Sequence, residues 1–308
     1  MDNYRNVPKA DLHVHMTGAI PLEVISLLIN NTANQDLEEV TIKEPVSAFE
    51  EYFKPWETIN SLLIRFEYID FAIKEMLKKM SLENVKYVEL RTSIINLAKI
   101  NGKSNEEIID LLVFSVEKYS KIFDITGKII VSISNPNEIN QYTNILDYIT
   151  THYRENIVGF DLIHGKTTSD INVQSFFDKV ENNGLGITIH ANHPENIINA
   201  INKCHAKRIG HALNLFDSIK AVDLVIKKEI CIEVCLSTSI LTNSILTIDR
   251  HPIKNIIEYS IPFTICSDNP LLHQKCLSDE YTIFFKNVDS NYTPIDLYNN
   301  QMKYKFFN

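Results

Sequence analysis

The strongest constraint on the fold is a repeated unit in which a short apolar segment precedes an amphipathic helical pattern. Residues 9–19 alternate apolar and polar side chains at the period of a strand. Further apolar segments, typical of buried parallel strands, occupy residues 85–91, 127–133, 157–162, 186–190, 207–211, 230–235 and 263–268. Eight strands alternating with helices predict a (β/α)8 barrel, and 308 residues leave room for an insertion beyond the about 250 that such a barrel needs.

Helical patterns separate most of these segments. They cover residues 21–30, 59–83, 105–123, 136–156, 175–183, 194–204 and 218–228. Residues 31–60 have few periodic apolar positions, so we expect a helical insertion after the first strand, made of loops and short helices that cover one end of the fold. A doubly wound open sheet is the alternative, but it predicts a glycine-rich phosphate loop, which this chain of 8 glycines does not contain. We expect residues 1–308 to form a single domain.

Composition narrows the classes of partner. The net charge of −9 and the pI near 5.6 disfavour general electrostatic attraction to nucleic acid or to anionic membranes, which leaves a small-molecule substrate as the expected partner. The chain has no apolar run of about 20 residues and begins without a secretory signal pattern, so we expect a cytoplasmic protein. The 5 cysteines are explained better as buried thiols than as a disulfide framework.

Histidines gather at the expected ends of the strands. His13 and His15 leave the first strand on one face, although an isolated pair of this kind is more often two ordinary polar positions. Later strands end in His190, His211 and Asp268, and in a barrel these side chains would meet at the same mouth. Three imidazoles and a carboxylate suit one divalent metal, Zn²⁺ first and Fe²⁺ less often, with a position open for water. The pattern predicts metal-dependent hydrolysis.

These residues lie in motifs that resemble the adenosine deaminase family of the metal-dependent amidohydrolase superfamily. The resemblance runs from Pro8 to about Tyr281 and includes Asp11-Leu12-His13-Val14-His15, Gly18-Ala19, His190-Ala191, Ile209-Gly210-His211, Ser237-Thr238-Ser239, His251-Pro252 and Ser267-Asp268-Asn269-Pro270. It implies four metal ligands, which are His13, His15, His190 and Asp268. It also implies that His211 orients the attacking water and takes its proton as general base.

The family's proton donor is missing from this chain. In the family, a glutamic acid that ends a His-Ala-Gly-Glu motif protonates the purine ring, whereas this chain reads His190-Ala191-Asn192-His193. The loop before the next helix is shortened, and Glu195 aligns with a glutamate that begins that helix. His193 is therefore a candidate catalytic residue, because imidazole titrates near neutral pH, although a histidine in a short loop can equally be a surface residue.

Positions on the substrate side also depart from the family pattern. Asn269 replaces a second aspartate, and Thr17 stands where many members that act on adenosine carry an aspartate that contacts the ribose. His164 interrupts a segment that reads Asp-Leu-Ala-Gly in the family. With Gly18 and Thr238, these three are the candidate substrate-binding residues. The pattern indicates that the metal chemistry is retained and that the substrate has changed.

Three hypotheses follow. The first is hydrolytic deamination of a purine nucleoside-like or related heterocyclic substrate other than adenosine. The second is hydrolysis of another C–N bond, such as an amide or imine, and the third is a non-catalytic relative that binds a ligand.

A structural expectation concerns Glu89 and Arg91, which share one face of a strand. We expect them to form a buried ion pair that stabilises the barrel mouth.

Overall fold

The chain folds as a barrel of eight parallel strands. The computed structural model describes residues 4–30, 37–62 and 66–307. The strands pair in chain order and are β1 (Lys9–His15), β2 (Val85–Thr92), β3 (Thr126–Ile133), β4 (Ile157–Leu162), β5 (Gly186–Ala191), β6 (Arg208–His211), β7 (Cys231–Val234) and β8 (Phe263–Ile265). Backbone hydrogen bonds from His15 to Asp268 and from Asp268 to His13 join the end of β8 to β1. The barrel prediction is confirmed, and the open-sheet alternative is wrong.

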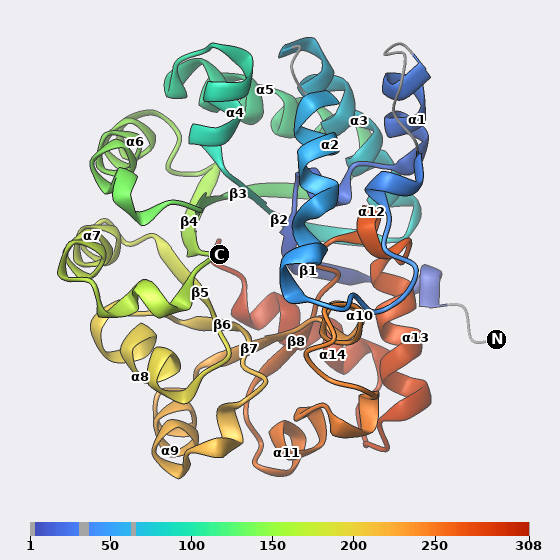
Figure 1. The fold of residues 1–308 in the computed structure, drawn as a ribbon, viewed down its shortest axis with the longest axis vertical. Helices are drawn as coiled ribbons and strands as arrows, with labels where there is room; N and C mark the ends of the chain where they lie inside the picture. The colour runs from blue at the N-terminus through green and yellow to red at the C-terminus, as the bar shows by residue number, and fades with distance from the viewer. Residues whose placement is uncertain (1–3, 31–36, 63–65, 308) are drawn as a thin grey trace.

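Helices form a ring around the strands (Figure 1). Those between strands include α1 (Leu22–Asn30), α4 (Ile94–Asn101), α5 (Asn105–Phe123), α6 (Ile139–His152), α7 (Ile171–Asn182), α8 (Pro194–Lys203), α9 (Ile219–Lys227), α10 (Leu236–Leu241) and α11 (Ile253–Glu258). After β8 follow α12 (Pro270–His273), α13 (Leu277–Asn287) and α14 (Pro294–Tyr304). Among the described residues, no helix is both long enough and apolar enough to cross a bilayer.

The insertion after β1 departs from the predicted pattern. We expected one helix over residues 59–83, but the structure has α2 (Lys54–Leu62) and α3 (Phe66–Leu82), with residues 63–65 outside the described part. The described part of the predicted loop region contains the short 3-10 helices η3 (Leu37–Val40) and η4 (Phe49–Phe53) before α2 begins. Two consecutive helices can share one apolar periodicity, so the period alone could not locate the break.

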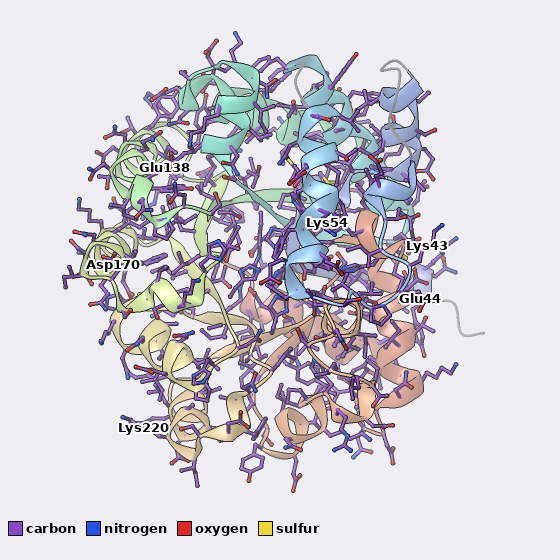
Figure 2. All side chains as sticks on the ribbon, in the orientation of Figure 1. Lys43, Glu44, Lys54, Glu138, Asp170 and Lys220 are labelled. Atoms are coloured by element: carbon purple, nitrogen blue, oxygen red, sulfur yellow. The ribbon has the colours of Figure 1, made fainter. Side chains whose placement is uncertain are left out.

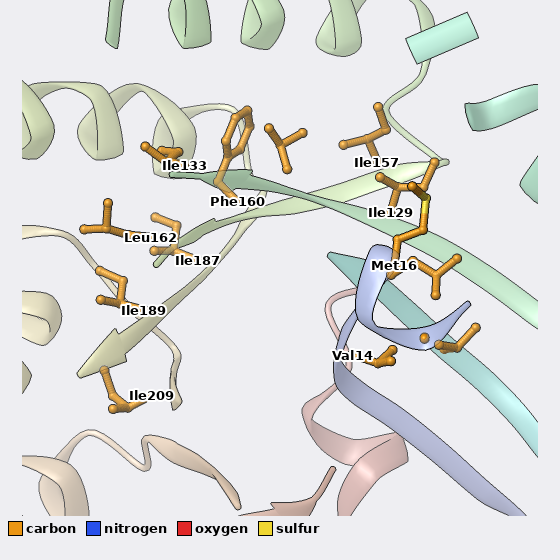
Figure 3. Packing of buried hydrophobic residues seen from close by; sticks show 14 of the residues in the cluster. Val14, Met16, Ile129, Ile133, Ile157, Phe160, Leu162, Ile187, Ile189 and Ile209 are labelled. Carbon is orange, nitrogen blue, oxygen red and sulfur yellow. The ribbon is translucent and has the colours of Figure 1, made fainter. Parts of the chain in front are cut away.

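Apolar side chains of neighbouring strands pack together outside the barrel and hold the helices against it. Figure 3 shows this for β3 to β6, where Phe160, Leu162, Ile187 and Ile189 lie side by side. Each is at most 1% exposed, and burying such a side chain contributes roughly 1.5–3 kcal/mol. In Figure 2 the charged Glu138, Asp170 and Lys220 lie at the periphery, as expected for the outer surface.

The amino-terminal end of the barrel is closed by the C-terminal tail. The chain ends near the centre of the ring (Figure 1), where the Phe306 ring lies 3.6 Å from the Arg208 guanidinium carbon. Arg208 Nη2 pairs with Glu89 Oε2 at 2.5 Å, and the Phe306 backbone N–H donates to Glu89 Oε1 at 2.7 Å. The prediction that Glu89 and Arg91 pair with each other is therefore wrong. Glu89 pairs with Arg208 of β6, and Arg91 pairs with Glu233 of β7.

Replacing Phe306 by alanine is expected to lower the free energy of unfolding by about 2 kcal/mol, because it empties a fitted space. A Cβ atom at Gly186 would lie only 2.1 Å from the Phe306 ring, so this glycine makes room for it. Urea denaturation checks the effect. The control is Phe114→Ala, which removes a ring that is 62% exposed. Equal losses in the two variants would contradict a packing role for Phe306.

Candidate metal centre and cavity

Five side chains from four parts of the barrel meet at its carboxyl end. They are His13 and His15 of β1, His190 of β5, His211 of β6 and Asp268 after β8, and they are called here the histidine cluster. His15 Nε2 lies 3.3 Å from His190 Nε2 and 3.4 Å from Asp268 Oδ1. His13 Nε2 lies 3.6 Å from Asp268 Oδ1, and His211 Nε2 lies 4.0 Å from Asp268 Oδ2. The structure thus brings the predicted ligands and the predicted base together.

The donor atoms fit a metal ion. The His13 ring is fully buried, yet its Nε2 atom has no hydrogen-bond partner, and an unsatisfied buried donor or acceptor is costly. Ligand atoms of His13, His15 and His190 lie within 4.8 Å of one another, as do those of His13, Cys235 and Asp268. Imidazole nitrogens with a carboxylate oxygen are ligands typical of zinc.

Buried carboxylates orient two of the histidines. His13 Nδ1 lies 2.8 Å from Glu233 Oε2, and His190 Nδ1 lies 2.9 Å from Asp161 Oδ1. A carboxylate at Nδ1 keeps the proton on that atom and leaves the Nε2 lone pair for a metal. Burial lowers the pKa of His13 well below its ordinary value, so the ring is neutral, as ligation requires.

Arg91 connects the two orienting carboxylates. Its guanidinium lies 3.3 Å from Asp161 Oδ1 through Nη1 and 2.5 Å from Glu233 Oε2 through Nη2, with all three side chains fully buried. Burial opposes ionisation of Asp161, but its interactions with His190 and Arg91 outweigh it and hold the pKa of that carboxyl below its usual range. Arg91 therefore joins the carboxylates that orient His190 and His13, and Glu233 pairs in addition with Arg208, whose Nε lies 2.9 Å from Glu233 Oε1.

Unusual backbone conformations direct His211 and Asp268 into the cluster. The φ angles are 67° at His211, 52° at Ala212 and 59° at Asp268, in the left-handed region that few residues other than glycine adopt. This turn explains why β8 ends at Ile265, short of the predicted residue 268, whereas the other predicted strands that follow β1 agree with the structure to within one residue at each end. Strain of this kind is typical of functional sites, where the surrounding structure holds it in place.

A cavity of about 570 Å³ opens beside the histidine cluster. Hydroxyl and amide side chains at the ends of β2 and β3 and just after them line one part, including Thr92, Ser93, Asn96, Ser132 and Ser134. Aromatic rings of the insertion line another part, namely Phe49, Tyr52, Phe53 and Trp56. The cavity therefore combines an apolar wall and a neutral polar wall with the cluster.

The predicted substrate-side residues fall into two groups. Thr17, His164, Thr238 and Asn269 line the cavity. Thr238 Oγ1 also donates to Asp268 Oδ2 at 2.7 Å. Gly18 does not line the cavity but packs behind it, since a Cβ atom there would lie 2.0 Å from Asn269 Oδ1.

His193 is not brought to the cavity. It is exposed and occupies the position before α8, and it is absent from the cavity lining. Asn192 lines the cavity instead, with its side-chain oxygen accepting a hydrogen bond from the Leu213 N–H at 3.1 Å. The short loop is thus tied to the segment after β6, and Pro194 at once begins the helix.

Sequence reasoning missed a link between the insertion and the metal site. Tyr52 of η4 lies 2.6 Å from His273 Nε2, and Asn269 Nδ2 donates to the Tyr52 hydroxyl at 3.0 Å and to Asp268 Oδ1 at 2.6 Å. Nothing in the irregular insertion signals this role, because Tyr52 and Asn269 are 217 positions apart. Asp161 and Glu233 could have been found, since carboxylates inside apolar strand segments need buried partners.

Known proteins resemble this chain over nearly its whole length. A family model described as adenosine deaminase matches residues 8–306. An adenosine deaminase of Shewanella woodyi is 28% identical over 290 residues, covering 90% of this chain and 87% of that protein. One of Clostridium perfringens is 26% identical over 302 residues, covering 93% and 90%.

Solved structures share the fold. The crystal structure of an adenine deaminase from Arthrobacter aurescens has a TM-score of 0.84 at 16% identity, covering 97% of this chain and 94% of that chain. An Arabidopsis N6-mAMP deaminase has a TM-score of 0.83 at 23% identity, covering 99% and 95%. With the family model matching almost all residues and the metal-side motifs meeting in space, the resemblance seen in the sequence is confirmed: the chain belongs to the adenosine deaminase family.

Proposed function

We propose that this protein binds one divalent metal ion at the histidine cluster and uses water to remove an exocyclic amine from a purine nucleoside-like substrate. Membership of the adenosine deaminase family makes the chain a hydrolytic enzyme acting on C–N bonds. The observation that carries the proposal for the site is the orphaned, buried His13 Nε2 atom among the nitrogen and oxygen atoms of the cluster. We propose Zn²⁺ as the metal, with Fe²⁺ as the alternative.

The residues of the cluster divide into ligands and a base. His13, His15, His190 and Asp268 would hold the ion, which supplies the Lewis acidity that makes water nucleophilic near neutral pH. Burial lowers the pKa of His211 well below its ordinary value, so the ring is neutral and has a nitrogen lone pair that can accept the proton of the attacking water. The distance of 4.0 Å between its Nε2 atom and Asp268 Oδ2 supports this role, because a base must lie close to the ligands.

The cavity suits a heterocycle that carries a polar group. Its volume of about 570 Å³ lies within the range of small-molecule sites. The rings of Phe53 and Trp56 offer an apolar surface for a flat base, and the hydroxyls of Ser93 and Ser134 can bond a sugar or similar polar group. We further propose that the chain is a single domain acting in the cytoplasm, which is consistent with its free cysteines.

A panel of amines tests this function. The zinc-loaded protein is incubated with adenosine, 2′-deoxyadenosine, adenine, AMP and N6-methyl-AMP, and released ammonia or methylamine and the product mass are measured. We expect at least one compound to exchange its amine for oxygen without splitting of the skeleton. Adenosine should react more slowly than that compound, because Thr17 and Asn269 replace acidic groups that the family uses.

The outcomes separate the three hypotheses. Fast conversion of adenosine would contradict the expected change of substrate. Loss of all activity after chelation and its return with added Zn²⁺ would support the metal's role. Cleavage of amides or imines, but of no amine in the panel, would favour hydrolysis of another C–N bond. A metal-loaded protein inactive on both panels would favour a non-catalytic relative.

A further inference from the structure

Deamination of a purine requires a proton donor as well as a nucleophile. The assignment of that donor to a residue of this chain therefore rests on the proposed function. When water adds to the ring carbon that bears the amine, the π electrons of the C=N bond move to the adjacent ring nitrogen. A side chain that protonates this nitrogen in the transition state typically contributes a factor of about 10²–10⁴ to the rate. The donor must therefore be a titratable group that faces the cavity.

Most titratable side chains that line the cavity within the described ranges already have another role. Those of the histidine cluster are ligands or the base. Arg91 is held between Asp161 and Glu233. Tyr52 is bonded to His273 and Asn269, and burial raises its pKa well above the ordinary value, which makes it a poor acid. In the part of the chain that the structure describes, His164 therefore remains as the candidate proton donor.

The backbone holds His164 at the cavity. It follows β4 and precedes Gly165, where a Cβ atom would lie 2.2 Å from the His190 carbonyl oxygen. Only glycine permits this close approach, so the loop that carries His164 is packed directly against the end of β5. His164 lines the cavity, and the nearby Asp161 carboxylate pairs with His190 and Arg91.

The surroundings of His164 suit an acid that exchanges protons with solvent. The residue is exposed at the cavity mouth, so water can return a proton to it after each reaction. Partial burial lowers its pKa, with further lowering from Lys166 and His190 and an opposing effect from Asp161. Its imidazolium form is thus a stronger acid than free imidazolium.

We propose that His164 is the catalytic residue that protonates the ring nitrogen next to the attacked carbon. Water loses one proton to His211 as its oxygen bonds to the ring carbon, and the displaced π pair takes a proton from His164. The C–N bond to the amine then breaks, and the leaving nitrogen takes the proton held by His211 and departs as ammonia. The oxygen that came from water gives its second proton to solvent as the carbonyl of the product forms. The product keeps the proton on its ring nitrogen, and solvent restores that of His164.

Variants of His164 test this role on the most active amine of the panel. His164→Ala and His164→Gln are expected to lower kcat by about 10²–10³-fold. The KM and the zinc content should stay within about twofold of those of the unmodified protein, because neither variant removes a ligand. Imidazole added to His164→Ala should restore activity, since the cavity mouth is open to solvent. The control is His152→Ala, which removes an exposed histidine from the end of α6.

Each outcome is decisive. Unchanged kcat in both His164 variants, with an active unmodified protein, would overturn the role of His164 and leave the proposed function intact. A loss of kcat in His193→Ala with none in His164→Ala would assign the donor to His193 instead. A loss that imidazole cannot restore, accompanied by a loss of zinc, would show a structural role. An unmodified protein that releases no amine would overturn the proposed function itself, and this proposal with it.

Discussion

Replacing His13 by alanine is expected to abolish zinc binding and activity together. His13 Nε2 is the buried atom that lacks a partner, and Glu233 at Nδ1 already fixes the ring so that Nε2 faces the cluster. Loss of a direct ligand should cost more than the 10–100-fold in metal affinity that is typical of an outer partner. Zinc content after dialysis, and the dissociation constant from competition with a coloured chelator, measure the effect.

A surface histidine provides the control for this experiment. His205→Ala removes a ring whose side chain is 36% exposed and which pairs with Asp178 and Glu181 away from the cluster. This variant should bind one zinc ion per chain with unchanged affinity. If His13→Ala retained full zinc occupancy at the original affinity, the assignment of His13 as a ligand would be wrong.

Replacing Arg91 by leucine is expected to destabilise the protein by about 3–5 kcal/mol, because it leaves the buried Asp161 carboxylate without its arginine and Glu233 with Arg208 alone. Arg91 is 1% exposed and lies between Asp161 and Glu233. Urea denaturation of the metal-free protein measures the change. Arg154→Leu, which removes an exposed arginine, should have little effect.

Arg91→Lys separates charge from geometry. Lysine keeps the positive charge but cannot reach both carboxylates with a planar fork. We expect a smaller loss of stability than in Arg91→Leu, together with zinc affinity weakened by about 10–100-fold, because Asp161 and Glu233 would orient the two histidines less well. Unchanged zinc affinity in Arg91→Lys would show that the arginine contributes charge alone.

The buried charges around the cluster support the proposal of a divalent metal ion there. Two guanidinium groups and four carboxylates lie together, and with neutral histidines they leave two uncompensated negative charges. The residues are Arg91, Arg208, Glu89, Asp161, Glu233 and Asp268. A divalent metal ion would balance this set, so metal binding should also stabilise the fold.

Local patterns predicted the barrel well and the insertion poorly. Strands that are buried on both faces need apolar side chains, and β2 to β7 are largely apolar segments. Their bounds could therefore be predicted from the sequence. The break between α2 and α3 was not readable, because both helices present apolar residues at one period. The sequence also could not show that His193 lies outside the cavity. Its position depends on hydrogen bonds that the Leu213 and Asn214 N–H groups donate to Asn192.

The sequence by itself determined which side chains gather at the site. His13, His15, His190, His211 and Asp268 each end a strand segment, and a parallel barrel must bring such ends to one mouth. Only the tertiary structure decided which groups orient these residues and that His164, not His193, lines the cavity. Arg91 between Asp161 and Glu233, and His164 held by Gly165 against β5, depend on contacts between distant strands and loops. Periodicity reports the environment of a residue, whereas contacts of this kind depend on how the elements pack together.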